Sequence, residues 1–144
     1  MPSMDASVTL PVPKEKAASI VLDPMLMGRA APDVERVDKI SDGKYLWVIL
    51  VKVGFVKKTV NLETNVQVRD GMMDFHGESP EIEITGRVSL AAIDDQTCQL
   101  VFRADYSGKG ALAGVINNVV KSRSASAKLE FQQRVLGLLK NQTP

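Results

Sequence analysis

His76 is the only histidine of the chain and the first residue to consider for acid–base chemistry. The ordinary pKa of an imidazole lies near neutrality, which suits a group that takes up and releases a proton. In an alternating strand His76 shares a face with Asp74 and Glu78, opposite Met73 and Phe75. Because we expect Phe75 to face the core, we expect His76 to face water and to take no part in catalysis.

A metal or phosphate site would need patterns that the chain carries only in part. One histidine and one cysteine, Cys98, do not supply the three or four ligands of a usual zinc site. The segment Ser107-Gly108-Lys109-Gly110 has the residue types of a phosphate-binding loop. It lacks the flanking glycine, the serine or threonine after the lysine and a preceding buried parallel strand. We therefore expect no metal, no cofactor and no catalytic residue.

Arg123 is the polar residue whose spacing best suits a ligand. It lies in line with Leu112, Ile116 and Val119 on one side of a 3.6-residue helix. At the end of an apolar tunnel, its guanidinium would fix a ligand carboxylate or carbonyl, since apolar sites usually contain a few convergent polar groups. The alternative is a solvated arginine beyond the end of the apolar stripe, and the residue pattern leaves both open.

The helix that would carry Arg123 is predicted over Ser107 to Leu139, with Ser107 as its capping residue. Its first half has one apolar stripe, formed by Leu112, Val115, Ile116, Val119 and Val120. Continuing that stripe leads to Arg123, Ser126 and Glu130, whereas Ala127, Phe131, Val135 and Leu138 lie about a quarter turn away. Either one curved helix wraps its sheet, or the first half covers a cavity while the second packs solidly.

The chain before this helix predicts an antiparallel sheet. Period-two alternation gives a first strand from Ala6 to Leu10, and Pro13 and Pro24 sit at the starts of two short helical segments, Lys14 to Leu22 and Pro24 to Pro32. Six strands follow, separated by turn signals of which Asp42-Gly43 and Asp70-Gly71 are the strongest: Val34 to Ser41, Lys44 to Val53, Val56 to Asp70, Met72 to Ser79, Glu81 to Ala92 and Thr97 to Tyr106.

One face of this sheet is apolar and must be covered, and the long helix is the element available to cover it. In the third of the six strands, for example, Val60, Leu62, Val66 and Val68 share a face with Thr64. The pattern predicts an α+β fold, with one domain over residues 1–144. Side chains that would line a cavity, and that fit a filled core equally well, are Trp47, Val60, Leu62, Met73, Phe75, Ile84, Phe102, Tyr106, Leu112, Ile116, Val119 and Arg123.

The strand from Tyr45 to Val53 is apolar on both faces. Trp47, Ile49 and Val51 alternate with Leu46, Val48 and Leu50. Either the strand is covered on both sides, or its outer face meets a partner.

Composition narrows the classes of function. The chain has 144 residues, of which 44% are hydrophobic and 24% charged, with a net charge of +1, so it can form a core but has no excess of cations for nucleic acid. The apolar run Tyr45 to Val51 is too short to span a bilayer. We see no signal-peptide pattern, and a lone cysteine forms no internal disulfide. We expect a cytoplasmic protein without a transmembrane segment.

The chain resembles the CoxG-like family, which is associated with carbon monoxide dehydrogenase, within the START-like (SRPBCC) helix-grip superfamily. The resemblance lies in Leu22-Asp23-Pro24 with Leu26 and Ala31-Pro32, in Val51 to Lys57 around a Val-Gly step, and in Leu100 to Gly114. It implies a helix-grip fold, in which a curved antiparallel sheet holds a long carboxy-terminal helix. It also implies a binder of a hydrophobic small molecule such as a lipid or quinone, in support of a molybdenum-flavin dehydrogenase.

Three hypotheses follow. The leading one is a non-enzymatic carrier with its ligand under the Ser107 to Val120 half-helix, reached past Pro24 to Pro32. The second is an interaction or assembly module that meets a dehydrogenase subunit, or a second copy of itself, through Tyr45 to Val53. The third, a polyketide-cyclase-like enzyme, is the weakest, because strand parity places almost no polar group inside the cavity.

Overall fold

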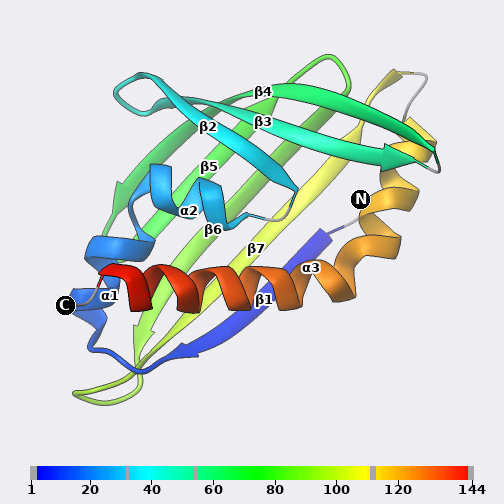
Figure 1. Cartoon of the computed structure of the whole chain (residues 1–144). Coiled ribbons are helices and arrows are strands. Elements are labelled where there is room, and N and C mark those ends of the chain that lie inside the picture. Colours follow the sequence, from blue (N-terminus) through cyan, green and yellow to red (C-terminus); the bar gives the residue numbers. More distant parts are fainter. Residues whose placement is uncertain (1–2, 32, 54, 111–112, 143–144) are drawn as a thin grey trace.

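The strands form one antiparallel sheet whose order is β1-β7-β6-β5-β4-β3-β2. The computed structural model describes residues 3–31, 33–53, 55–110 and 113–142. Within these ranges the elements are β1 (Ser3–Leu10), α1 (Lys14–Val21), α2 (Pro24–Ala30), β2 (Val34–Ser41), β3 (Lys44–Val53), β4 (Val56–Arg69), β5 (Met72–Glu78), β6 (Ile82–Ala92), β7 (Cys98–Gly108) and α3 (Ala113–Gln142). The three helices lie on the same side of the curved sheet (Figure 1). The predicted α+β helix-grip architecture is confirmed.

The start of the last helix was predicted wrongly. Ser107 and Gly108 end β7, where Gly108 pairs with Ile82, and the Lys109 amide donates to the Glu81 carbonyl at 2.8 Å. These ladder contacts with β6 override the local capping signal of the serine. The Gly108 amide also donates to Asn117 Oδ1 of α3 at 3.2 Å, which ties the end of the sheet to the helix.

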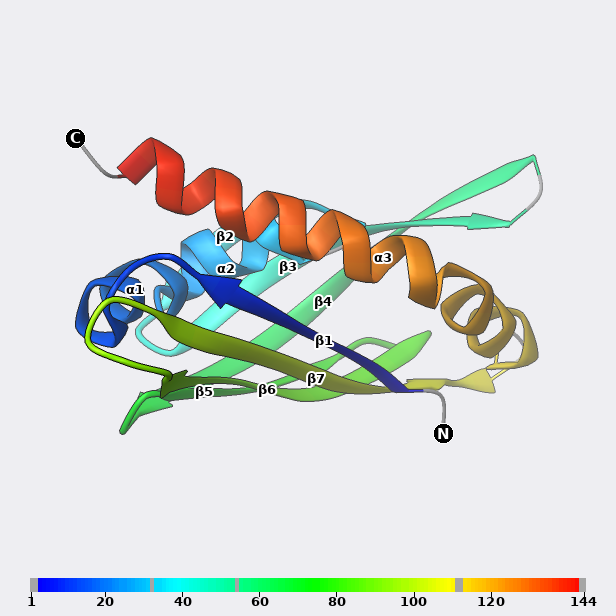
Figure 2. The same ribbon diagram turned by 90° about the horizontal axis from the view of Figure 1, so that it is seen from below.

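The second half of α3 packs solidly on the sheet. Ala127, Phe131 and Val135 are at most 1% exposed, and the Phe131 ring lies 4.8 Å from that of Phe102 on β7. The first turns of α3 stand at an angle to the rest of the helix (Figures 1 and 2). Along the rest of α3, Phe131 and Val135 fill the core, whereas Glu130 and Arg134 line the cavity described below.

The buried face of β4 agrees with the predicted alternation except at its end. Val60, Leu62, Thr64 and Val66 are buried, and the Thr64 hydroxyl donates to the Leu62 carbonyl at 3.2 Å. Val68, predicted on the same face, is 48% exposed. Val68 lies next to the β4–β5 turn, and the alternating pattern alone does not show where the buried part of the strand ends.

Two short helices close one end of the sheet. Asp23 caps α2, because its Oδ1 accepts from the Met25 amide at 2.9 Å. A Cβ on Gly28 would lie 2.7 Å from Val37 Cγ2 on β2, so α2 packs directly on the sheet there. None of the helices within the described ranges is long and apolar enough to span a lipid bilayer.

Candidate functional site

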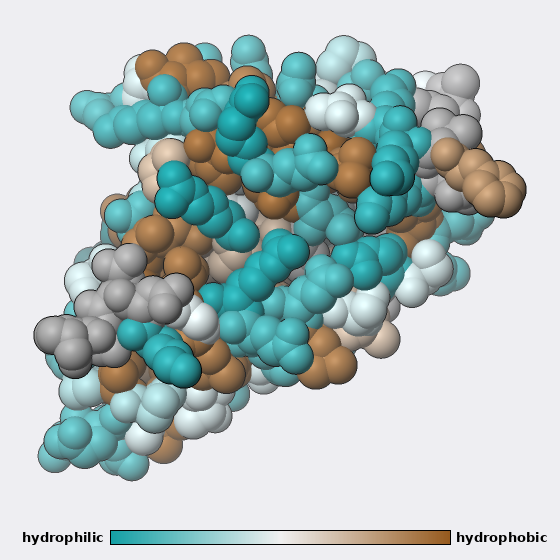
Figure 3. Space-filling view, viewed as in Figure 1, coloured by the Kyte–Doolittle hydropathy of each residue, from teal (hydrophilic) through white to brown (hydrophobic). Residues whose placement is uncertain are grey.

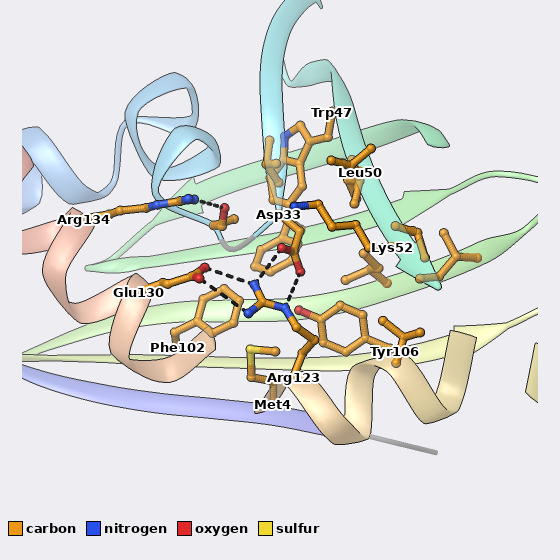
Figure 4. A pocket seen from close by; sticks show the side chains of 18 residues that line it. Met4, Asp33, Trp47, Leu50, Lys52, Phe102, Tyr106, Arg123, Glu130 and Arg134 are labelled. Atoms are coloured by element: carbon orange, nitrogen blue, oxygen red, sulfur yellow. Dashed lines mark hydrogen bonds and ion pairs between the residues drawn. The ribbon is translucent and has the colours of Figure 1, made fainter. Parts of the chain in front are cut away.

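A cavity of about 390 Å³ lies between the sheet and α3. Its walls come from β1, β3, β5, β6 and β7, from the start of β2 and from α3, as Figure 4 shows from close by. On the face seen in Figure 3, hydrophilic side chains gather along the opening between the β2–β3 hairpin and α3, with less polar surface visible deeper between them. The cavity therefore has an apolar interior and a charged rim.

Seven of the residues predicted to line a cavity do line it: Trp47, Phe75, Ile84, Phe102, Tyr106, Val119 and Arg123. Val60, Leu62 and Met73 are buried in the filled core and are not part of the lining. Leu112 and the side chain of Ile116 lie outside the described residues. Among the described α3 residues in the wall, Val119 belongs to the half-helix that was predicted to cover a cavity, whereas Arg123, Glu130 and Arg134 belong to the second half. The cavity therefore extends further along the helix than predicted.

Three aromatic rings form the inner wall. The centroids of Trp47 and Phe75 are 5.4 Å apart, and those of Phe75 and Phe102 are 5.9 Å apart. Met4 on β1 and Ile49 on β3, which were missed as lining residues, extend this apolar surface. Among the described residues Trp47 Nε1 is the buried side-chain nitrogen that lacks a hydrogen-bond partner.

Arg123 crosses the rim and binds two carboxylates. Its Nη2 lies 2.7 Å from Asp33 Oδ1 and 3.1 Å from Glu130 Oε2. Its Nε donates to Asp33 Oδ2 at 3.4 Å, and its Nη1 donates to Ser126 Oγ at 2.8 Å and to Glu130 Oε1 at 3.5 Å. These five contacts match the five N–H donors of a guanidinium, so the protein itself occupies Arg123 fully.

The position of Asp33 is set by backbone geometry. It adopts a φ of 65°, which aspartate tolerates better than most residues, and its carbonyl accepts from the Leu50 amide of β3 at 2.9 Å. On the helix side, Arg134 donates to the carbonyl of Ala31 at 3.0 Å. Arg123, through Asp33, and Arg134, through Ala31, therefore hold α3 to the segment between α2 and β2.

The ionisation of the site follows from these neighbours. Hydrogen bonds from Arg123 to Asp33 and then to Glu130 raise the pKa of the guanidinium, which stays charged. Burial, and to a lesser extent the charge of Asp33, raise the pKa of the Tyr106 phenol well above its usual range. Tyr106 therefore remains a neutral hydroxyl, and Figure 4 shows it pointing toward the Arg123 cluster.

The expectation of almost no polar group at the cavity was wrong. Asp33, Lys52, Arg123, Glu130 and Arg134 all contribute to its walls. The signal for part of this set was present in the sequence, because Arg123 and Glu130 continue the apolar stripe of the helix. Asp33 and Lys52 come from other elements and carried no such signal.

His76 lies away from the cavity on the outer face of the sheet, as parity predicted. Its side chain is 42% exposed, its Nδ1 lies 2.9 Å from Thr85 Oγ1, and its Nε2 lies 3.3 Å from Glu83. Glu78 completes a group of possible metal ligands, but the Lys109 ammonium already binds that carboxylate at 2.6 Å. Cys98 is fully buried, and burial raises the pKa of its thiol.

The outer face of β3 is less open than its sequence indicated. Val48 is 8% exposed, and Leu50 contributes to the cavity wall at the edge of the sheet, where β2 begins. Leu46 is partly buried. The expected apolar outer surface of Tyr45 to Val53 is therefore reduced to a small patch.

No protein-family model and no curated protein matches the chain. Among solved structures it is similar to a conserved protein from Geobacillus kaustophilus, with a TM-score of 0.75 and 16% identity over 97% of this chain and 96% of that one. A START superfamily protein from Mycobacterium smegmatis has a TM-score of 0.74 and 12% identity over 98% and 99% of the two chains. The ZhuI aromatase/cyclase from Streptomyces sp. R1128 has a TM-score of 0.72 and 15% identity over 98% and 94%.

At these identities the likeness concerns the fold. One of these neighbours is named as a START superfamily protein, and at the level of the fold this agrees with the wider of the two predicted resemblances. The narrower one, to the CoxG-like family, stays a prediction. The comparisons thus identify the chain's architecture as the START-like helix-grip fold.

Proposed function

We propose that this protein binds an apolar small molecule in the cavity beneath α3 and does so without catalysing a reaction. The observation that carries the proposal is the cavity itself. Its volume of about 390 Å³ falls within the range usual for small-molecule sites, and its inner wall consists of Trp47, Phe75, Phe102 and aliphatic neighbours. Transfer of apolar surface from water to such walls would drive binding.

The state of Arg123 narrows the class of ligand. A ligand carboxylate would have to displace Asp33 or Glu130 from the guanidinium, or else lie next to both of them. Like charges repel even at this partly exposed rim, and the displaced carboxylate would lose its partner. The cavity is therefore suited to uncharged ligands.

Tyr106 supplies a complementary polar group. Its neutral hydroxyl can donate to a carbonyl or ether oxygen of a ligand, while the rest of the ligand contacts the aromatic wall. An uncharged apolar ketone or quinone-like molecule meets both requirements.

A matched pair of ligands tests this function. We would titrate the protein by calorimetry with a naphthyl methyl ketone and with the naphthoic acid that has the same ring, at neutral pH where the acid is ionised. We expect the ketone to bind at least about tenfold more tightly, a difference of about 1.4 kcal/mol. Equal or tighter binding of the acid would disprove the ligand class, and absence of binding by both would disprove the function.

Variants then test which residues cause the preference for the ketone over the acid. The double substitution Asp33→Asn with Glu130→Gln removes both carboxylates from Arg123, so we expect the acid to gain affinity. Tyr106→Phe should weaken the ketone and leave the acid unchanged. The control is Asp74→Asn, which breaks an ion pair with Arg87 on the outer face of the sheet and should change neither affinity.

A cyclase-like enzyme is the second candidate. The observation in its favour is the set of charged groups around the cavity, together with the Tyr106 hydroxyl, which can donate a hydrogen bond to a substrate oxygen. The name of one structural neighbour, an aromatase/cyclase, points the same way. Its test is formation of a cyclised product from a poly-β-ketone substrate, with Tyr106→Phe as the variant expected to abolish it.

The interaction module is the weaker alternative. A dehydrogenase subunit or a second copy of the chain would have to bind the small patch at Leu46 on the outer face of β3. Substitution of Leu46 by aspartate should abolish such a complex while leaving ketone binding intact. If the complex persists in the Leu46→Asp variant, the patch on the outer face of β3 is excluded as its binding site.

A further inference from the structure

The tip of the β3–β4 hairpin carries an unusual apolar side chain. Phe55 is fully exposed, the highest exposure among the large hydrophobic residues of the described ranges. Figure 2 shows this hairpin extending past the rest of the sheet, at the same end of the molecule as the beginning of α3. No part of the fold buries the Phe55 ring at this projecting position, so the ring is available to contact a partner surface.

The hairpin next to Phe55 is positively charged. Lys52, Lys57 and Lys58 flank it, and residues 51–58 contain no acidic side chain. Lys58 lies 3.5 Å from Glu81 of the neighbouring loop, whereas Lys52 and Lys57 form no ion pair among the described residues. The tip therefore combines one exposed aromatic ring with an excess of cations.

The opposite end of the sheet differs in this respect. Ile93, in the turn between β6 and β7, is also exposed, at 55%, but Asp94 and Asp95 follow it directly. An exposed apolar residue thus occurs at both ends of the sheet, but Phe55 has cationic neighbours and Ile93 has acidic ones. Ile93 is for that reason a matched control.

The tip also lies close to the cavity. Val51 and Lys52 line the cavity wall, and the next residue, Val53, pairs with Val56 across the turn that carries Phe55. A surface that contacted the tip would therefore lie near the end of the cavity wall that Val51 and Lys52 form. Molecules that suit an apolar cavity partition into lipid, so a lipid surface is a direct source for them.

From these observations we infer that the hairpin tip, formed by Lys52, Phe55, Lys57 and Lys58, docks on an anionic lipid surface. Phe55 enters the interfacial region, where an aromatic ring finds apolar contacts, and the lysines bind the acidic headgroups. Docking brings the membrane close to the part of the cavity wall formed by Val51 and Lys52. The inference adds a surface to the function proposed above, and vesicle binding is measured without any cavity ligand, so the two can fail separately.

Vesicle co-sedimentation tests the inference. The protein is mixed with vesicles of phosphatidylglycerol and phosphatidylcholine in equal parts, and with vesicles of phosphatidylcholine alone. We expect the protein to bind the anionic vesicles, to bind them less tightly when salt is added, and to bind the vesicles of phosphatidylcholine alone less tightly still. Lys57→Gln should weaken binding about fivefold, as expected for one lysine near an anionic surface, and Phe55→Ser should also weaken it.

Ile93→Ser is the control and should bind the vesicles as the unaltered protein does. Phe55→Trp adds a direct readout, because its emission should shift to the blue on contact with anionic vesicles. No binding by the unaltered protein would overturn the inference. So would full binding by Phe55→Ser and Lys57→Gln, or equal binding to both kinds of vesicle.

Discussion

The guanidinium of Arg123 and the carboxylate of Asp33 lie 2.7 Å apart, although 90 positions separate them in the chain. One residue belongs to α3 and the other precedes β2, so their contact joins the helix to the far side of the cavity's opening (Figure 4). The same guanidinium binds Glu130 from its own helix. This arrangement both closes part of the rim and occupies the arginine that would otherwise bind an anion.

Asp33→Asn should change stability little. The side chains of Arg123 and Asp33 are 31% and 39% exposed, and ion pairs of such exposure are screened by water and usually contribute about 1 kcal/mol or less. We expect a loss of that size in the free energy of unfolding, measured with urea. A loss of several kcal/mol would show that the pair supports the fold rather than the rim.

Phe131→Ala should be costly, because this side chain is 1% exposed and contacts Phe102 on the sheet. Truncating a buried phenylalanine typically costs about 3–5 kcal/mol. Leu129→Ala on the same helix is the control, since Leu129 is 59% exposed and its loss should change the free energy of unfolding by less than about 0.5 kcal/mol. Similar losses for the two variants would contradict the orientation of α3.

Gly86→Ala should disturb the cavity from behind. A Cβ at this position would overlap the Phe75 ring and lie 2.7 Å from the Arg103 carbonyl, so the ring must move toward the cavity that it lines. We expect a loss of stability of about 1–3 kcal/mol and weaker ketone binding. Gly137→Ala on α3, where a Cβ meets nothing within 4 Å, should instead stabilise the protein by up to about 1 kcal/mol.

The ion pair between Asp74 and Arg87 should make the free energy of unfolding depend on pH in the acidic range. The Arg87 guanidinium, hydrogen-bonded to Asp74, holds the pKa of that carboxyl below its ordinary value. The pair therefore stabilises the fold above the pKa of the unfolded state, about 4, and this contribution is lost as the pH falls through the folded-state pKa. The difference in stability between the unaltered protein and Asp74→Asn should be present at neutral pH and shrink in acid.

That difference is followed by urea unfolding across the acidic range. A difference that grows on acidification would contradict the direction of the shift. Asp94 makes a useful comparison, because the Gln96 amide and then the Thr97 hydroxyl lower its pKa without any cation. Asp94→Asn should show the same trend with less dependence on salt.

Much of the fold could be predicted because its signals are local. Asp42-Gly43 and Asp70-Gly71 mark turns that the structure contains, and Gly43 and Gly71 adopt φ values of 76° and 75° there. Alternation placed Phe75 inward and His76 outward correctly. The start of α3 was missed because pairing of Gly108 with Ile82 decides it, and a local capping pattern carries no information about that partner.

The site was harder to predict than the fold. Periodicity placed Trp47, Phe102 and Val119 on the correct faces, yet it could not separate them from Leu62, which fills the core. That distinction depends on how far α3 stands from the sheet. Asp33 lacked any signal, because its role depends on an arginine 90 positions away.

Filling the cavity tests the central claim most directly. Ile49→Trp places a large ring into the space, and Ile40→Trp, at a position 52% exposed on β2, adds the same ring outside it. Titrated by calorimetry, the unaltered protein and Ile40→Trp should each bind one equivalent of the naphthyl methyl ketone, and Ile49→Trp should bind none. Unchanged binding by folded Ile49→Trp, or no binding by the unaltered protein, would contradict the account.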